Sequence, residues 1–184
     1  MTHIGLRRML DRPLLRGSGK GLTALSDADR YAQNERQSGT EMALSDSEIR
    51  DALNSRSLIL EPFDDKSLNP AGYDLRVDET AVLQPGEQGL VATMERVELG
   101  QDLVGVLHVR SSLAREGLIA SLALVDPGFK GQLTISLFNS SRKTVQLRTG
   151  ERFVQLTLVK LGRQAATKYE GRYQDSTGVV GSRR

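Results

Sequence analysis

The sequence predicts an all-β fold, and two observations support this. Short apolar or alternating runs recur along the chain and are separated by Gly, Pro, Asn and Asp turns. Within one of them, Leu133, Ile135 and Leu137 alternate with polar residues, as in a strand with one buried face. This spacing is typical of a β-sandwich or barrel. The predicted strands cover residues 57–61, 89–94, 103–109, 117–124, 132–138, 144–147 and 153–161.

One short helix is expected before the first strand. Ser45 stands three residues before Glu48, which is the spacing of a capping box, and the helix should run to about Leu53. Helical periodicity does not return after this point.

Residues 1–41 differ from the rest of the chain because they hold seven basic residues and no alternating apolar run. Asp11, Asp27 and Asp29 argue against a targeting peptide. We therefore expect a disordered extension or a mis-assigned start, followed by one domain over residues 42–184.

Composition excludes several kinds of chemistry. The chain has no Cys and two His, which leaves no thiolate nucleophile and no zinc site of the usual kinds. Catalysis would have to use carboxylates, hydroxyls, Arg, Lys or a metal brought by the substrate. No apolar run is long enough to cross a membrane, and a net charge of +2 does not favour nucleic acid as a partner.

The segment 110–117 places two Arg and two Ser within six residues after a predicted strand. Ser111 and Ser112 can open a helical turn whose amides, with the guanidinium forks of Arg110 and Arg115, would hold phosphate. A Ser-capped turn with solvated Arg explains the same residues, and the segment alone leaves both readings open.

The segment 126–131 joins two apolar strands and has Pro127 and Gly128 where a type II turn requires them. A tight connection would explain it. Phe129, an aromatic residue directly after this turn, also suggests a wall for a ring-shaped ligand beside Asp126. Two weaker candidates are Asp74, in an otherwise apolar segment, and the Tyr-containing polar tail at 168–178.

In chain order, these pieces resemble the five motifs of the trimeric dUTPase and dCTP deaminase superfamily. The motifs are AGYDL at 71–75, VRSSLAREG at 109–117, LVDPGFKGQLTISLFN at 124–139, GERFVQLTLVKL at 150–161 and YEGRYQDSTG at 169–178. The sequence of the tail and the helix that opens at Ser45 resemble the deaminase-like branch, which contains archaeal-type dUTPases, more than the common bacterial and eukaryotic dUTPases. The resemblance implies a β-clip or jelly-roll-like barrel, a homotrimer with interfacial sites, and a mobile tail from about residue 165.

Within this superfamily, one activity hydrolyses dUTP and the other deaminates dCTP without zinc. The deaminases carry a catalytic Glu in a sequence like TLEL, where this chain has Ser136. A Ser hydroxyl has too high a pKa for that proton transfer, whereas the hydrolase base is present as Asp126. We therefore expect a cytoplasmic dUTP diphosphatase that forms dUMP and pyrophosphate. The alternatives are a dCTP deaminase, a bifunctional enzyme that converts dCTP to dUMP, and a non-catalytic nucleotide-binding module.

The resemblance also implies the roles of individual residues. Asp126 would be the catalytic base, and Mg²⁺ would be held mainly by the phosphates of dUTP, with Asp74 of another subunit in contact through water. Phe129 would lie under the deoxyribose, and Tyr173 would cover the base. The remaining substrate-binding residues would be Arg110, Ser111, Ser112, Arg115, Gln155, Tyr169, Arg172, Ser176 and Thr177.

Overall fold

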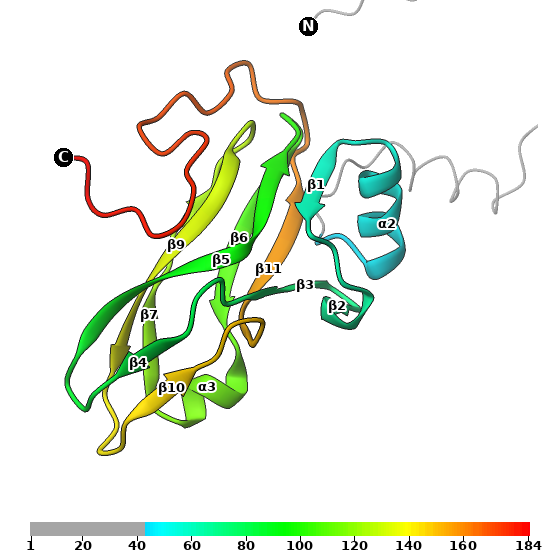
Figure 1. Ribbon diagram of the computed structural model, residues 1–184. Coiled ribbons are helices and arrows are strands. Elements are labelled where there is room, and N and C mark those ends of the chain that lie inside the picture. Colours follow the sequence, from blue (N-terminus) through cyan, green and yellow to red (C-terminus); the bar gives the residue numbers. More distant parts are fainter. Residues whose placement is uncertain (1–42) are drawn as a thin grey trace, which may run out of the picture. The chain divides into compact units, whose positions relative to one another are not determined.

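The structure is a computed structural model that describes residues 43–184, and it is built mostly of β-strands (Figure 1). The strands of this region form three sheets, in the orders β1-β5-β9-β7, β2-β3-β11-β6-β8 and β10-β4. This arrangement confirms the predicted all-β class. The strand bounds are β1 Leu58–Glu61, β2 Leu68–Asn69, β3 Gly72–Arg76, β4 Ala81–Leu83, β5 Gln88–Leu99, β6 Leu103–Val109, β7 Leu118–Ser121, β8 Leu124–Val125, β9 Lys130–Asn139, β10 Val145–Leu147 and β11 Arg152–Lys160.

The predicted helix forms as α2 (Asp46–Asn54). Its first turn is closed by the predicted capping box, in which Ser45 and Glu48 bond reciprocally to each other's backbone N–H groups. The side chains of Ile49 and Ala52 are buried against the sheet core. The carboxylate of Glu48 accepts hydrogen bonds from the backbone amide and from the hydroxyl of Ser45. These two bonds, of which the backbone bond has the larger effect, lower the pKa of Glu48.

Strands β2, β3 and β4 were not predicted, and the predicted strand at 117–124 is two strands. Four of the five residues of β3 are buried, so its sequence does not alternate. At 118–125 the chain changes sheets, because β7 pairs with β9 whereas β8 pairs with β6. This change of partner between Ser121 and Leu124 leaves a short irregular link that lies beside the candidate site.

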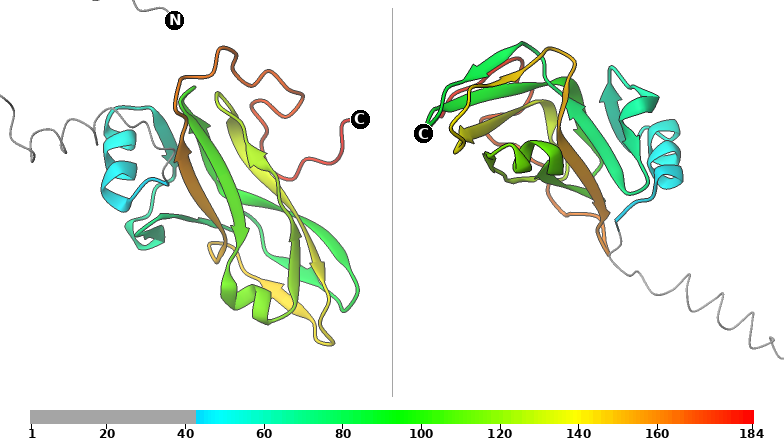
Figure 2. Two further views of the ribbon diagram at one scale, coloured as in Figure 1. Left: turned by 180° about the vertical axis from the view of Figure 1, so that it is seen from behind. Right: turned by 90° about the horizontal axis from the view of Figure 1, so that it is seen from below.

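The two larger sheets enclose one apolar core. Strand β11 is the central strand of its sheet, between β3 and β6. Its side chains Phe153, Leu156 and Leu158 are fully buried. Figure 2 shows from two sides how β5 and β9 form the opposite wall. Replacing any of these core side chains with Ala would cost about 2–5 kcal/mol of stability.

The C-terminal tail, from residue 161 onward, lies along the upper part of β9 (Figure 1). The amide of Gln132 donates to Ser176 O at 2.9 Å, and the amide of Asp175 donates to Lys130 O at 2.8 Å. Strand β7 pairs with the other half of β9, from Ser136 to Asn139. The tail and β7 therefore occupy successive parts of β9, and the mobility expected of the tail stays a prediction.

The prediction for residues 1–41 falls outside the described residues, so a single domain over 42–184 also stays a prediction. In the part of the chain that is described, no helix has the length and apolar character needed to span a membrane.

Candidate active site

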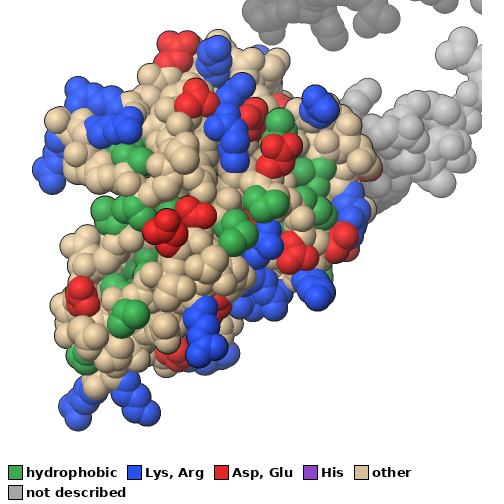
Figure 3. All heavy atoms as spheres, in the orientation of Figure 1, with side chains coloured by type: hydrophobic (Ala, Val, Ile, Leu, Met, Phe, Trp, Pro, Cys, Tyr) green, Lys and Arg blue, Asp and Glu red, His purple; other side chains and the backbone are tan. Residues whose placement is uncertain are grey.

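A pocket of about 330 Å³ lies between the tail and the strands β5, β6, β8 and β9. Figure 3 shows the surface hollowed below the tail, with hydrophobic side chains along the hollow. Its size is within the range of small-molecule sites. Among the described residues that line it, Asp126 is the one carboxylate. The uncharged polar lining includes Ser121, Gln132, Thr134, Ser136 and Ser176.

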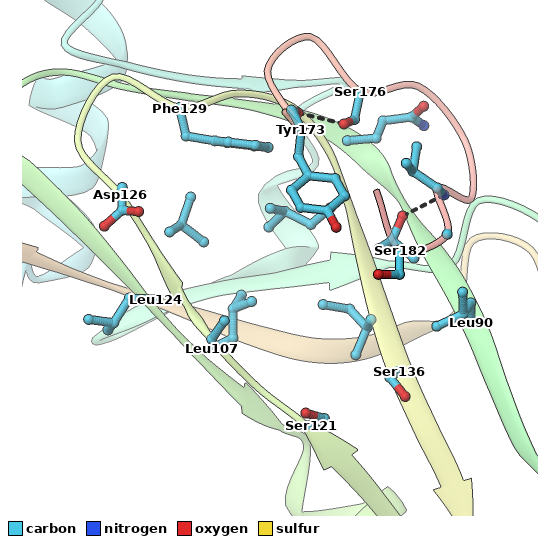
Figure 4. Close-up of a pocket in the computed structure, with 18 of the residues that line it drawn as sticks. Leu90, Leu107, Ser121, Leu124, Asp126, Phe129, Ser136, Tyr173, Ser176 and Ser182 are labelled. Atoms are coloured by element: carbon cyan, nitrogen blue, oxygen red, sulfur yellow. Dashed lines mark hydrogen bonds between the residues drawn. The ribbon is translucent and has the colours of Figure 1, made fainter. Parts of the chain in front are cut away.

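A tight turn places Asp126 and Phe129 at one end of the pocket (Figure 4). The amide of Phe129 donates to Asp126 O at 3.1 Å, and Gly128 has φ +81°, which agrees with the predicted type II turn. Phe129 is buried, and Tyr169 from the tail packs edge-on against it at 5.5 Å between ring centres. Asp126 itself is exposed, and no ion pair within residues 43–184 involves it. Its carboxylate is therefore available to a ligand.

The other end of the pocket is a row of residues across one sheet. Ser136 on β9 has Leu90 on β5 and Ser121 on β7 as its Cα partners, so all three side chains share one face. All three line the pocket. The Nε2 atom of Gln88, two residues before Leu90 on β5, donates to Ser136 Oγ at 2.8 Å.

Side chains as well as backbone hold the tail over the pocket. Thr134 Oγ1 accepts from the amide of Val180 at 3.0 Å, and Gln174 Oε1 accepts from the amide of Lys130 at 2.9 Å. Outside the pocket, Arg96 bonds to Asp175 at 3.0 Å and to Glu98. Both bonds raise the pKa of Arg96, and the bond to Asp175 has the larger effect.

A side chain at position 131 would displace the tail. A Cβ there would lie 2.8 Å from Ser176 N and 3.0 Å from Ser176 O, and the residue has φ +140°. Glycine is therefore required at this contact for two reasons, namely space and backbone conformation.

A second polar cluster surrounds Asp74 on β3, whose side chain is 5% exposed. Arg110 Nε lies 3.0 Å from Asp74 Oδ2, and Arg152 Nη1 lies 3.8 Å from the same oxygen. Gln155 is the Cα partner of Asp74 on β11. Because two guanidinium groups already hold this carboxylate, the arrangement does not support the expected water-mediated metal contact.

The predicted site residues thus fall into two groups. Asp126, Phe129, Tyr169, Tyr173 and Ser176 line the pocket. Helix α3 (Ser111–Arg115), which carries Ser111, Ser112 and Arg115 of the predicted phosphate residues, lies at the opposite end of the molecule from the tail (Figures 1 and 2). The residues predicted to bind phosphate that do not line the pocket are Arg110, Ser111, Ser112, Arg115, Gln155, Arg172 and Thr177.

Individual residues in these groups have contacts of their own. Arg172 bonds to Arg183 in the tail. The hydroxyl of Ser176 donates to Tyr173 O at 2.5 Å, which makes Ser176 an anchor of the tail. Arg115, in the last turn of α3, is exposed.

Within residues 43–184, no three His, Cys, Asp or Glu side chains gather closely enough to hold a metal ion.

Sequence reasoning did not assign the side chains of Leu90, Ser121, Gln88 or Ser136 to the site, although the resemblance implied that backbone groups of residues 118–125 read the base. Ser136 was considered only as the replacement for a Glu. The available signal was the alternation in residues 132–138, which put Gln132, Thr134 and Ser136 on one face. Nothing in the sequence indicated that this polar face would form the floor of the pocket, because that depends on the pairing of β5, β9 and β7.

Comparison with known proteins shows similarity to nucleotide enzymes. A family model described as dCTP deaminase-like matches residues 77–161. A dCTP deaminase of Pyrococcus furiosus is 44% identical over 158 residues, which cover 78% of this chain and 98% of that protein. A probable deoxyuridine 5′-triphosphate nucleotidohydrolase of Sulfolobus islandicus rod-shaped virus 1 is 33% identical, with coverage of 76% and 97%.

Among solved structures, the 2′-deoxycytidine 5′-triphosphate deaminase from Agrobacterium tumefaciens superposes with a TM-score of 0.59. It is 20% identical, and the match covers 66% of this chain and 49% of that one. The fold is therefore that of the dUTPase and dCTP deaminase superfamily, as expected.

The expectation of a dUTP diphosphatase was wrong. Relatives that are 41% to 44% identical are named dCTP deaminase, which supports the alternative reading instead. The expectation gave too much weight to the missing carboxylate at position 136. A carboxylate does face the pocket, on Asp126 at its other end.

Proposed function

The chain belongs to the dCTP deaminase-like family, and we propose that it deaminates dCTP to dUTP and ammonia. The observation that carries the proposal is the 44% identity to a dCTP deaminase across 98% of that protein's length. The pocket supports it, because it combines apolar walls with one free carboxylate. A cytoplasmic location is part of the same proposal.

Hydrolytic deamination adds water to C4 of the cytosine ring, protonates N3, and then breaks the bond between C4 and the amino nitrogen. One group must take a proton from water and later return one to the leaving ammonia. We assign this role to Asp126, the carboxylate that faces the pocket and has no ion pair among the described residues. Phe129 would pack against the deoxyribose, and Tyr169 supports Phe129 from the tail.

The triphosphate would be bound by a neighbouring subunit. Within one chain, α3 lies at the far end of the molecule from the tail (Figure 1). Two copies can bring these regions together, which is our reason for proposing a homotrimer with interfacial sites. Arg110, Ser111, Ser112, Arg115 and Gln155 would then come from one copy, and Tyr173, Arg172 and Thr177 from the tail of another.

Magnesium is proposed only as a companion of the triphosphate. Asp74 does not fit a metal ligand, because Arg110 and Arg152 hold its carboxylate. Mg²⁺ would offset the charge of the three phosphates when it is bound. No step of the proposed deamination depends on it.

A bifunctional enzyme that converts dCTP to dUMP is the second candidate. The observation that favours it is the relative named as a probable deoxyuridine triphosphate nucleotidohydrolase, which the match covers to 97%. Its first step is the deamination proposed above.

The test is to incubate the purified protein separately with dCTP and dUTP, with and without Mg²⁺, and to separate the products by ion exchange. Conversion of dCTP to dUTP with release of ammonia is the expected result. Formation of dUMP from dCTP would identify the bifunctional enzyme. Unchanged dCTP would contradict the proposal, and nucleotide binding without any turnover would identify a binding module.

A further inference from the structure

Two guanidinium groups meet at one carboxylate where β11 begins, and one of them has no role towards a substrate in the proposals above. Arg110 directly follows β6, and Arg152 is the first residue of β11. Both lie beside Asp74, with Arg110 Nε at 3.0 Å and Arg152 Nη1 at 3.8 Å from the same oxygen, Oδ2. The carboxylate is 5% exposed, whereas the side chains of Arg110 and Arg152 are 30% and 40% exposed. The carboxylate is therefore the inner part of this cluster, and the two guanidinium groups reach the surface.

Backbone carbonyl groups also hold the two arginine side chains. Arg110 Nη1 donates to Arg152 O at 3.2 Å, and Arg152 Nη1 donates to Lys66 O at 2.8 Å. The backbone amide of Arg110 donates to Phe153 O at 3.1 Å, which holds the end of β6 against the start of β11. These bonds, together with Asp74, keep two like charges side by side.

The cluster keeps a positive charge and unused hydrogen-bond donors. Asp74 offsets one of the two guanidinium charges, so one positive charge remains. Each guanidinium has five N–H donors. Within residues 43–184, the Nη2 atom of neither arginine makes a hydrogen bond. Because planar guanidinium groups bind phosphate oxygens through paired hydrogen bonds, the cluster fits a phosphate-containing anion.

The neighbours of the cluster indicate which anion this is. Arg110 directly precedes Ser111 and Ser112 of α3, and Gln155 is the Cα partner of Asp74 on β11. These are residues to which the triphosphate was assigned above. Arg152 was not assigned to it, although it shares the carboxylate of Asp74 with Arg110.

We propose that Arg152 binds the triphosphate of dCTP together with Arg110. The proposal rests on the assignment of dCTP as the substrate. The second guanidinium adds positive charge and planar donors to the subsite of a polyanion. Asp74 serves as the structural partner that offsets the repulsion between the two arginine side chains.

Inorganic tripolyphosphate is the direct probe, because it contains the anion and no base. Calorimetric titration should show a dissociation constant about 5- to 20-fold higher in Arg152→Ala than in the parent, as expected for charged hydrogen bonds at a partly exposed site. Arg152→Lys keeps the charge without the planar group and should recover part of this loss. Binding of deoxycytidine, which has no phosphate, should change by less than twofold in an NMR titration.

Arg163→Ala is the charge-matched control. Arg163 lies in the tail, is exposed and makes no ion pair within the described residues. This variant should bind tripolyphosphate within twofold of the parent. For the nucleotide itself, dCTP binding is measured in an Asp126→Asn background, where turnover is suppressed. Arg152→Ala should weaken dCTP binding there by about the same factor as tripolyphosphate binding.

Four results would overturn the inference. Unchanged tripolyphosphate binding in Arg152→Ala would remove Arg152 from the anion site, and an equal loss in Arg163→Ala would show a general effect of net charge. An equal loss of deoxycytidine binding would show that the substitution acts through the fold. A loss for tripolyphosphate but not for dCTP would make the cluster a site for free inorganic phosphate.

Failure of the proposed function is seen separately, as an absence of ammonia when the parent protein is given dCTP. Tripolyphosphate has no amino group, so its binding does not depend on that measurement.

Discussion

Glu95 and Asp126 are two carboxylates of the same small domain in opposite surroundings. Glu95, on β5, is fully buried, and it accepts from Arg76 Nε at 2.7 Å and from the Arg76 amide at 2.8 Å. Asp126 is exposed, lines the pocket and has no ion pair within the described residues. A carboxylate whose oxygens are bonded inside the chain stabilises the fold, whereas one that faces a pocket without such bonds is available for chemistry.

The Arg76–Glu95 pair also affects its neighbours. Tyr73 OH lies 3.5 Å from Glu95 Oε1 and accepts from the amide of Asp64 at 2.9 Å. Arg76 Nη2 donates to Pro62 O at 2.6 Å. These bonds join β3 and β5 to the 62–64 connection. We therefore expect substitutions here to change stability, and substitutions at Asp126 to change turnover.

The largest expected effect is on catalysis. Asp126→Asn should reduce the rate of dCTP deamination by about 10²- to 10⁴-fold, because an amide cannot accept the proton from water. Thermal unfolding should be unchanged. Asp51→Asn, on the exposed face of α2, is the control and should retain full activity. An Asp126→Asn protein as fast as the parent would remove Asp126 from the mechanism.

The next effect is on stability. Glu95→Gln removes the buried charged partner of Arg76, whose guanidinium keeps only the longer carboxylate contact, with Asp64 at 3.5 Å, and should lower the free energy of unfolding by about 3 kcal/mol. Urea titration followed by circular dichroism measures this. Glu98→Gln tests a more exposed pair with Arg96 and should cost less than about 1 kcal/mol. Equal losses in the two variants would contradict the assigned role of burial.

A smaller effect is expected from the tail. Gly131→Ala places a Cβ against Ser176 and should loosen the tail, raising KM for dCTP about tenfold and exposing Arg172 to trypsin sooner. Gly150→Ala is the control, because Gly150 also has a positive φ, +79°, but no atom lies within 4 Å of its added Cβ. If trypsin cleaves both variants at the same rate and both show the same KM, backbone strain rather than contact with the tail causes the effect of Gly131→Ala.

The smallest effect concerns pH. Burial raises the pKa of Tyr73 above its ordinary value of 10.0. The stability that this shift contributes is complete below pH 10 and is lost as the pH rises through the folded-state pKa. Tyr73→Phe should be less stable at pH 9, because it lacks the acceptor for Asp64, yet should lose less stability than the parent between pH 9 and 11. Urea titrations at pH 9 and 11 measure this. Equal losses of stability in the parent and in Tyr73→Phe would rule out a contribution from the raised pKa of Tyr73.

Much of the fold could be predicted from local pattern. The capping box of α2 and the alternation in β9 are properties of neighbouring residues, and both were found. Strand β3 was missed because both of its faces are buried, which removes alternation. The division of residues 117–124 was missed because it depends on a change of sheet, which pattern alone does not encode.

The site was predicted only in part for a related reason. Asp126 and Phe129 occur in a recognisable turn, so they could be found from spacing. Gln88 and Ser136 are 48 positions apart and meet only through strand pairing. Asp74 was expected near a metal, and its partner Arg152 comes from a strand that pairs with β3 only in the folded chain.

The most direct test of the central claim is the amount of ammonia released for each dCTP consumed, measured over many turnovers for the parent and Asp126→Asn. We predict one ammonia for each dCTP with the parent protein, and almost none over the same time with the variant. Consumption of dCTP without ammonia, or an undiminished release from the variant, would contradict the account.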